Sequence, residues 1–284
     1  MRHEVRYKRR VGESVDMKVG LAGFGNVGRD LAKRLGAGVI PEMELVAVTA
    51  RDLVKAEAAA RDISPGLRVV TLAELPALCD VVVECATADS FAEIARAVLE
   101  AGKMLICVSA GGVPSCPDLV EMARRHGGRV RVASGAMPGL DIIRCAAEGT
   151  IRKVHLKSRI KPSSMAHEPY VLERGHDFDK RPPTEPILIF EGTAGVAAGH
   201  FPRHFNVAVS LSLAGIGFDR TTVEIWIDPD IAGAIHQVEL EGDDIGLTLT
   251  SRNRPSENPR TSRIVAPSII AALRAMVAPV VSGS

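Results

Sequence analysis

A glycine-rich turn near the start of the chain limits the fold more than any other feature of the sequence. Residues 23–28 (GFGNVG) follow an apolar run and open a helical pattern over Val27–Leu35. In such a turn Gly23 makes the tight bend, Gly25 lets the backbone approach a pyrophosphate, and Gly28 lets the helix lie close to the strand. Free N–H groups at the helix start favour phosphate. The motif predicts a dinucleotide site formed by Gly23, Gly25, Asn26, Val27 and Gly28; the alternative is a purely structural turn.

Short apolar runs alternate with helical patterns through the first half of the chain. The predicted strands are Lys18–Ala22, Glu44–Thr49, Arg68–Val70, Asp80–Glu84, Met104–Val108 and Val130–Ala133. The clearest helix spans Asp89 to Gly102, with Asp89 as its predicted cap and Gly102 as its end. This alternation predicts an α/β domain over residues 17–149, a Rossmann-type doubly wound parallel sheet. An aromatic content of only 4% agrees with a sheet packed by small aliphatic side chains.

The strand pattern changes after about Gly149. Polar and apolar residues alternate in Val154–Ile160, Ile187–Phe190, Thr222–Asp228, Ile235–Leu240 and Leu247–Ser251. Such alternation is typical of an antiparallel sheet with one exposed face. Helical patterns cover Pro202–Ala214 and Thr261–Val277, and Lys161–Pro186 is predicted to be a long loop. Residues 150–284 are therefore expected to form a second, α+β domain for catalysis and oligomer contacts, whose last helix can return to the first domain.

Composition and cysteine usage indicate a cytoplasmic protein. The formal net charge is +1, so no global field favours nucleic acid or an anionic membrane. The 5 cysteines include no CxxC pair and favour small buried thiols over disulfides or a metal site. Residues 1–16 are basic, lack an apolar stretch and are interpreted as a disordered extension rather than a signal peptide. The apolar tract Ile264–Val281 contains Pro267 and Arg274, which favours an amphipathic helix over a membrane span.

The second strand lacks the acid that commonly follows it in NAD-binding domains. An Asp or Glu at its end would bind the ribose 2′-hydroxyl of NAD, but here Thr49 is followed by Ala50 and Arg51, with Asp52 only afterwards. A guanidinium pairs with phosphate in a planar fork, which suits the 2′-phosphate of NADP. We therefore expect NADP to be accepted beside NAD, with a preference for NADP left open; the alternative is that Arg51 is a solvated loop residue.

Four further segments, taken with the glycine turn, resemble the L-aspartate dehydrogenase family. They are residues 133–141 (ASGAMPGLD), 190–194 (FEGTA), 201–219 (FPRHFNVAVSLSLAGIGFD) and 256–262 (SENPRTS). The resemblance implies interconversion of L-aspartate with oxaloacetate and ammonia through iminosuccinate, using NAD or NADP. It also implies a Rossmann domain, an α+β domain and a homo-oligomer, a dimer or tetramer.

The resemblance assigns site residues in the second half of the chain. It implies that His236 is the catalytic acid and base and that Ala136 and Asn206 contact the cofactor. Two segments differ from the usual family pattern, in addition to the missing acid. His204 stands where the family usually has asparagine, and the sequence at Ala110–Gly112 is also unusual.

The residues themselves also favour histidine chemistry. Release of ammonia needs a group that titrates near neutral pH, which suits histidine. Of the 8 histidines, His236 alternates with Val238 and Leu240 on the apolar face of a predicted strand. Burial there would desolvate the imidazole; the alternative is a core histidine without a catalytic role. His204 is a second candidate.

The sequence does not identify which residues would bind the substrate carboxylates. Lys161, Arg260 and Arg263 are candidate cations, and Thr261 and Ser262 candidate N–H donors at a helix start, although each also fits a surface role. Glu84 and Cys85 end the fourth strand, where nicotinamide commonly lies. Two other functions remain alternatives: a related NADP-dependent reductase of another imine or keto acid, and a non-catalytic NADP(H)-binding sensor. No metal site is predicted.

Overall fold

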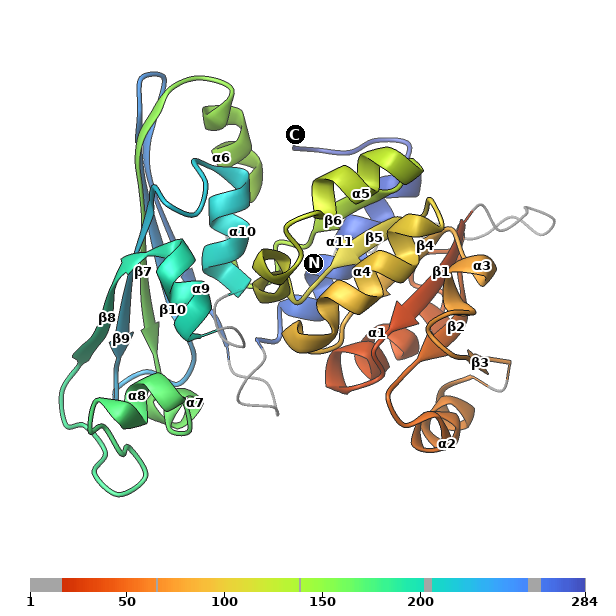
Figure 1. Ribbon diagram of the computed structural model, residues 1–284, viewed down its shortest axis with the longest axis horizontal. Coiled ribbons are helices and arrows are strands. Elements are labelled where there is room, and N and C mark those ends of the chain that lie inside the picture. The colour runs from red at the N-terminus through yellow and green to blue at the C-terminus, as the bar shows by residue number, and fades with distance from the viewer. Residues whose placement is uncertain (1–16, 65, 138, 202–205, 255–261, 284) are drawn as a thin grey trace, which may run out of the picture. The chain divides into compact units, whose positions relative to one another are not determined.

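The computed structural model describes residues 17–283 apart from 65, 138, 202–205 and 255–261 (Figure 1). The chain divides into two compact units. Unit 1 runs up to Val108 and includes Ser115–Arg131 and Ile270–Val280. Unit 2 comprises Ser109–Pro114, Val132–Ile269 and the residues from Val281 on. The predicted extension, residues 1–16, lies outside the described part.

Unit 1 is built on a six-stranded sheet with strand order β3-β2-β1-β4-β5-β6. Its strands are β1 (Met17–Ala22), β2 (Met43–Thr49), β3 (Arg68–Val69), β4 (Val81–Glu84), β5 (Met104–Cys107) and β6 (Arg129–Val132). Strand β1 pairs in parallel with β2 and β4, β2 with β3, and β4 with β5. All four residues of β4 are buried, as expected for a central strand covered on both faces. This strand order is that of a Rossmann domain, so the predicted architecture is confirmed.

The helices of unit 1 alternate with these strands. They are α1 (Asn26–Gly36), α2 (Leu53–Ile63), α3 (Leu75–Leu78), α4 (Phe91–Glu100) and α5 (Leu119–His126). Helix α4 buries all the apolar residues of its predicted stripe. The predicted cap is wrong, because Asp89 lies inside a short 3₁₀ turn, Ala88–Ser90, and α4 begins only at Phe91. Gly102 follows the end of α4 with φ +69°, a conformation that favours glycine.

Unit 2 contains a five-stranded, mostly antiparallel sheet with strand order β11-β10-β7-β9-β8. Its strands are β7 (Ile151–Ile160), β8 (Ile187–Thr193), β9 (Thr221–Ile227), β10 (Ile235–Gly242) and β11 (Gly246–Arg252). Strands β7 and β9 pair in parallel, whereas the other pairings are antiparallel. Alternate residues of β7, β9 and β10 are buried, so one face of the sheet forms a core and the other stays partly open.

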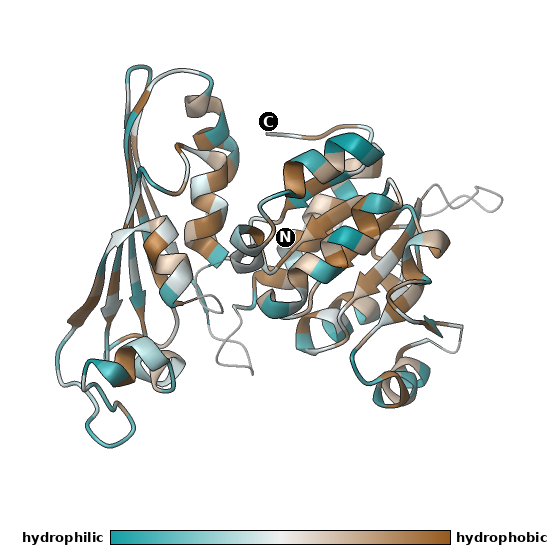
Figure 2. Ribbon diagram, in the orientation of Figure 1, coloured by the Kyte–Doolittle hydropathy of each residue, from teal (hydrophilic) through white to brown (hydrophobic). Residues whose placement is uncertain are grey.

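Helices cover the buried face of this sheet in Figure 1. They are α6 (Leu140–Ala147), α7 (Pro162–Met165), α8 (Pro169–Glu173), α9 (Ala194–His200) and α10 (Asn206–Ala214). Helix α10 buries most of its residues and is brown and white over most of its length in Figure 2. The prediction of one long loop over Lys161–Pro186 is wrong in part, since α7 and α8 form there and bury Met165 and Val171.

The main segment of unit 2 begins at Val132, directly after Arg131 of unit 1, whereas the sequence predicted the boundary at residue 149. The reason is that α6 contacts α10, so the segment before β7 belongs to the core of unit 2. The last helix, α11 (Val265–Val277), begins in unit 2 and contributes its residues from Ile270 on to unit 1.

Two further predictions concern a membrane span and the state of the cysteines. None of the helices formed by the described residues is long and apolar enough to cross a bilayer. The five cysteines are free thiols; four are buried, whereas Cys145 is exposed. The cytoplasmic location stays a prediction.

Candidate functional site

The glycine turn has the geometry that its sequence predicts. Gly23 adopts φ +113°, and a Cβ there would lie 2.6 Å from backbone atoms of Cys85 and Ala86. At Gly28 a Cβ would lie 2.2 Å from the carbonyl oxygen of Gly23, so α1 approaches the end of β1 closely. At Gly25, by contrast, no heavy atom of the described residues, apart from those adjoining it in the chain, lies within 4 Å of the position of a Cβ. The turn is therefore tight on its inner side and open above Gly25.

The start of α1 fits the phosphates of a dinucleotide. The helix spans 11 residues, its N-cap is Gly25, and its first turn holds no acidic residue and receives no side-chain cap. The N–H groups of the first turn carry positive partial charge and bind anions well. Backbone donors beside an open glycine are what a pyrophosphate needs, so Asn26, Val27 and Gly28 fit the predicted cofactor site.

Arg51 and Asp52 lie between β2 and α2. Arg51 is exposed. The Asp52 carboxylate caps α2 by accepting a hydrogen bond from the backbone N–H of Lys55 at 3.0 Å. Asp52 is thus bound locally and does not replace the acid that is missing after β2.

His236 lies on the buried face of β10, and 5% of its surface is exposed. Its Nδ1 lies 3.0 Å from Oγ of Ser158, a fully buried serine directly opposite on β7. Burial lowers the pKa of His236 to about 4. The prediction of a desolvated imidazole on this face is confirmed, but the free protein holds it neutral at pH 7 rather than poised near neutrality.

Ala136 is held close to the same row of side chains. Its carbonyl oxygen accepts hydrogen bonds from Oγ of Ser251 at 3.3 Å and from Nδ2 of Asn253 at 3.5 Å. Ser251 lies opposite His236 on the other neighbouring strand, β11. Ser158, His236 and Ser251 therefore form a row across three strands, and Ser251 connects this row to the Ala136 loop.

Asn206 begins α10 and contacts the segment with the unusual Ala-Gly-Gly sequence. Its Oδ1 accepts a hydrogen bond from the backbone N–H of Gly111 at 2.8 Å. Gly111 belongs to the 3₁₀ helix Ala110–Ser115, which is also part of unit 2. The amide group of Asn206 thus orders this segment through its oxygen.

The remaining predicted residues differ in how they are bound. Glu84 is fully buried, and its carboxylate accepts from the backbone N–H groups of Ala86 at 2.9 Å and Val108 at 3.2 Å. Burial raises the pKa of the Cys85 thiol far above its ordinary value. These two hydrogen bonds of Glu84 tie the end of β4 to the end of β5.

The structure does not select among the remaining candidate residues. It describes Lys161, Ser262 and Arg263 but shows no contact that distinguishes one of them, whereas His204, Arg260 and Thr261 lie outside the described residues.

Known proteins match both halves of the chain. A family model described as aspartate dehydrogenase, C-terminal, matches residues 141–276, and one described as homoserine dehydrogenase, NAD binding domain, matches residues 23–133. L-aspartate dehydrogenase 3 of Bordetella bronchiseptica is 41% identical over 269 residues, which cover 95% of this chain and 98% of the relative. L-aspartate dehydrogenase of Bradyrhizobium diazoefficiens is 39% identical, with 92% of each chain covered. The chain belongs to the aspartate dehydrogenase family.

Solved structures agree with this family in fold. Aspartate dehydrogenase from Thermotoga maritima superimposes with a TM-score of 0.71 at 23% identity, covering 94% of this chain and 99% of that one. A hyperthermophilic archaeal homoserine dehydrogenase in complex with NADPH gives a TM-score of 0.57 at 13% identity, covering 90% and 96%. As in other members of the aspartate dehydrogenase family, the N-terminal half of this chain is a nicotinamide dinucleotide-binding domain, and the substrate class is a small molecule.

Three residues that contact the predicted site of this family member were not predicted from the sequence. They are Ser158, Ser251 and Asn253. A signal for the first was present: Val154, Leu156, Ser158 and Ile160 form one buried series, in which a serine needs a partner. No signal identified Asn253, which lies just beyond the end of β11.

Proposed function

We propose that this chain is an NAD(P)-dependent L-aspartate dehydrogenase in which His236 is the general acid and base. The observation that carries the proposal is the row of buried Ser158 and His236 with half-buried Ser251, tied to the Ala136 loop within the part matched by the aspartate dehydrogenase model. A desolvated imidazole beside a loop assigned to the cofactor is suited to proton transfer at a substrate nitrogen or oxygen.

A bound nicotinamide would supply hydride acceptance from Cα of aspartate in its neutral amino form, which would leave iminosuccinate as the protonated imine. The chain's own residues then manage water and protons. Water adds to the carbon of the protonated imine, and His236 accepts the proton that this water loses, which leaves a neutral carbinolamine. His236 returns that proton to the nitrogen, and as ammonia leaves, His236 accepts the proton of the carbinol hydroxyl and the carbonyl of oxaloacetate forms. The neutral state of His236 before substrate binds suits the first step, since only a neutral imidazole accepts a proton. Two substrate carboxylates nearby would raise its pKa and favour the charged form in between.

We propose two groups of cofactor contacts. The turn at Gly23, Gly25 and Gly28 and the start of α1 bind the pyrophosphate, while Ala136 and Asn206 contact the nicotinamide half. The open space above Gly25 and the uncapped N-terminus of α1 support the first assignment. The second comes from the family resemblance and from the hydrogen bonds that order both segments.

The experiment that tests the activity measures NADPH and NADH oxidation with oxaloacetate and ammonia, beside a panel of other 2-keto acids. We expect turnover with oxaloacetate and a loss of kcat of about 10²-fold or more in His236→Ala. The matched control is His155→Ala, a histidine on the opposite face of the same sheet. Turnover only with another acid would replace the substrate, and tight NADPH binding without any turnover would favour a sensor protein.

We propose further that NADP is accepted, because Arg51 is exposed after β2 and the neighbouring acid, Asp52, caps α2. Arg51→Asp should lower kcat/KM for NADP by on the order of tenfold and leave that for NAD unchanged or raised. Asp52→Asn, which keeps the cap, is the control and should leave the cofactor ratio as it is. Strict use of NAD by the unmodified chain would contradict this proposal.

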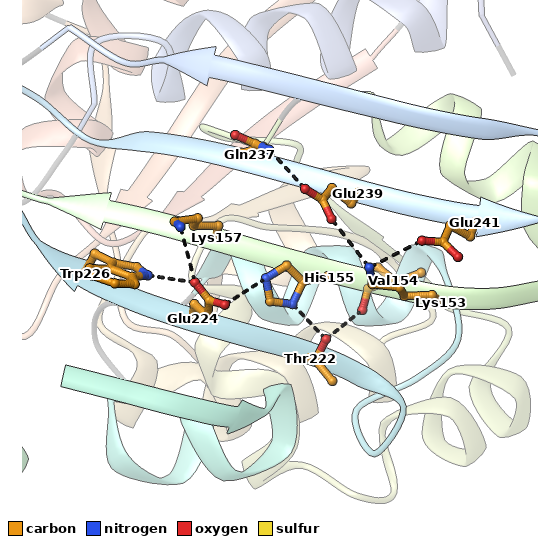
Figure 3. Close-up of polar contacts among 10 residues, drawn as sticks. All are labelled: Lys153, Val154, His155, Lys157, Thr222, Glu224, Trp226, Gln237, Glu239 and Glu241. Carbon is orange, nitrogen blue, oxygen red and sulfur yellow. Dashed lines mark hydrogen bonds and ion pairs between the residues drawn. The ribbon is translucent and has the colours of Figure 1, made fainter. Parts of the chain in front are cut away.

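We also propose that the chain forms a homo-oligomer through the open face of the unit 2 sheet, opposite its helices (Figure 1). On this face Lys153 pairs with Glu239 and Glu241, and Lys157 pairs with Glu224 (Figure 3). Rows of opposite charge can pair with the same rows of a second copy. The double variant Lys153→Glu, Lys157→Glu should dissociate the homo-oligomer, which light scattering would detect as a lower molar mass. Arg61→Glu on α2 should leave the molar mass unchanged. An unchanged mass of the double variant would refute the interface.

A further inference from the structure

We propose that a clamp of three polar side chains holds the Ala136 loop so that the backbone N–H of Ala136 stays free for the carboxamide oxygen of the nicotinamide. The side chains of the clamp are Ser251, Asn253 and Ser268, which act as positioning residues. This inference rests on the proposed function, since the contact of Ala136 with the nicotinamide half belongs to it. It adds the atom of the cofactor that is bound and the side chains that keep the donor in place.

One part of the clamp holds the carbonyl oxygen of Ala136. This oxygen accepts hydrogen bonds from Oγ of Ser251 at 3.3 Å and from Nδ2 of Asn253 at 3.5 Å. Nδ2 of Asn253 also donates to Oγ of Ser251 at 3.2 Å, so the two side chains support each other. The backbone N–H of Asn253 donates to the carbonyl oxygen of Ala234 at 2.8 Å, two residues before His236. The Ala136 carbonyl is therefore held in place relative to the strand that carries His236.

The other part of the clamp holds the backbone on the N-terminal side of Ala136. The N–H of Gly135 donates to Oγ of Ser268 at 3.1 Å. Ser268 lies in the first turn of α11 and donates its own proton to the carbonyl oxygen of Val265 at 2.7 Å, which leaves its oxygen to accept from Gly135. Gly135 adopts φ +56°, a conformation that favours glycine. The loop is thus fixed both from the end of β11 and from the start of α11.

The peptide group between these two fixed points has no partner. Among the described residues, neither the carbonyl oxygen of Gly135 nor the N–H of Ala136 makes a hydrogen bond. The next amide along the chain is bonded, since the N–H of Met137 donates to the carbonyl oxygen of Ser134 at 2.9 Å. Ala136 is half-buried, and a backbone N–H in such a place needs an acceptor. A peptide that is held on both sides and open in the middle suits a ligand that brings its own acceptor.

The nicotinamide carboxamide brings such an acceptor. Its oxygen is uncharged and accepts a hydrogen bond from an N–H group. A bond at this oxygen fixes the orientation of the nicotinamide ring, which hydride transfer requires. The adenosine and pyrophosphate parts of the cofactor do not take part in this bond. Loss of the clamp should therefore weaken only the hold on the nicotinamide half.

Amide hydrogen exchange of the unmodified chain tests the free donor directly. Without ligand, the Ala136 amide should exchange faster than the bonded amides of Gly135 and Met137. NADPH should slow the exchange of Ala136 on the order of tenfold, whereas 2′-phospho-ADP-ribose, which lacks the nicotinamide, should not. The thionicotinamide analogue of NADPH, whose sulfur is a weak acceptor, should slow it less than NADPH does. Equal slowing by NADPH and by the fragment or the analogue would overturn the proposal.

Binding titrations of variants test the clamp. Ser268→Ala and Asn253→Ala should each raise the Kd for NADPH by about threefold to tenfold and change the Kd for 2′-phospho-ADP-ribose by less than about twofold. Ser268→Thr keeps the hydroxyl and should bind NADPH as the unmodified chain does. The matched control is Ser212→Ala, because the Ser212 hydroxyl donates to the carbonyl oxygen of Ala208 within α10 and does not bond to the loop. It should leave both Kd values unchanged.

The outcomes separate this inference from the proposed function. An unchanged Kd for NADPH in both alanine variants, or an equal rise for NADPH and the fragment, would overturn the clamp and leave turnover of oxaloacetate and ammonia intact. If Ser268→Ala does not fold, Asn253→Ala and the exchange of the unmodified chain still decide the matter. Protection of Ala136 by NADPH in a chain that does not turn over oxaloacetate would refute the proposed substrate and support the clamp.

Discussion

The burial of one imidazole has consequences for stability that are independent of catalysis. His236 is packed among apolar residues of the unit 2 core, with only a neutral hydroxyl at Nδ1. Desolvation penalises the charged ring, and no carboxylate among the described residues hydrogen-bonds to it to offset that penalty. Protonation therefore favours the unfolded chain, where the ring is in water.

This effect predicts a pH-dependent stability that His236 alone can remove. Its pKa is about 4 in the folded protein and about 6.5 in an unfolded chain. The contribution is complete above pH 6.5 and is lost as pH falls towards 4, because there only the unfolded chain binds the proton. Between pH 7 and 4.5 the free energy of unfolding should fall by about 2 kcal/mol more in the native chain than in His236→Gln. Denaturant titrations at the two pH values measure this, and equal losses would contradict it.

The two glycines Gly25 and Gly28, in the turn between β1 and α1, differ in how much the fold requires them. Gly28 is required by the fold, since a Cβ there would lie 2.2 Å from the carbonyl oxygen of Gly23. Gly25 has φ −80° and open space around it, so the fold itself would accept a side chain. Packing therefore does not require a glycine at this position, and the open space agrees with the proposed pyrophosphate contact.

Alanine substitutions should separate these two roles. Gly28→Ala should destabilise the protein by about 1–3 kcal/mol through overpacking. Gly25→Ala should keep the Tm of the ligand-free protein but raise the Kd for the dinucleotide on the order of tenfold, because one close phosphate contact is lost. Gly199→Ala in α9, which also has open space around it, is the control for both. Calorimetry and cofactor titration check these results; an unchanged Kd in Gly25→Ala would rule out the phosphate contact.

The elements also show where prediction from sequence succeeds and where it fails. The stripe of α4 and the alternation in β10 were predicted because their apolar periods of about 3.6 and 2 are written in neighbouring residues. The helices α7 and α8 were missed because they are only 4 and 5 residues long and depend on packing into the unit 2 core. The cap at Asp89 failed because a 3₁₀ turn precedes α4.

At the scale of the whole molecule, helix α11 contributes residues to both units. Helix α11 starts in unit 2, while its residues from Ile270 on belong to unit 1. Within unit 1 Leu273 is fully buried, and the guanidinium of Arg274 donates to the carbonyl oxygen of Val39 at 2.6 Å. The dinucleotide-binding unit is thus completed by residues from the end of the chain.

Truncation of one side chain in this segment should destabilise unit 1. Leu273→Ala should lower the free energy of unfolding by about 2–5 kcal/mol, because it leaves a cavity in the core. Val280→Ala is the matched control, since Val280 is 85% exposed and should have no effect. Denaturant unfolding followed with and without dinucleotide measures both variants. A loss below about 1 kcal/mol in Leu273→Ala would mean that the segment contributes little to unit 1.

The sequence by itself determined the Rossmann architecture, the mostly antiparallel second sheet and the buried face on which His236 lies, because each depends on local spacing of apolar residues and glycines. The sequence allowed the last helix to return to the first domain, but only the tertiary structure decided that Ile270–Val280 belong to unit 1 and that Ser158 and Ser251 flank His236. These contacts join residues far apart in the chain, and strand register and helix docking create them. No local pattern of residues in the sequence predicts these long-range contacts.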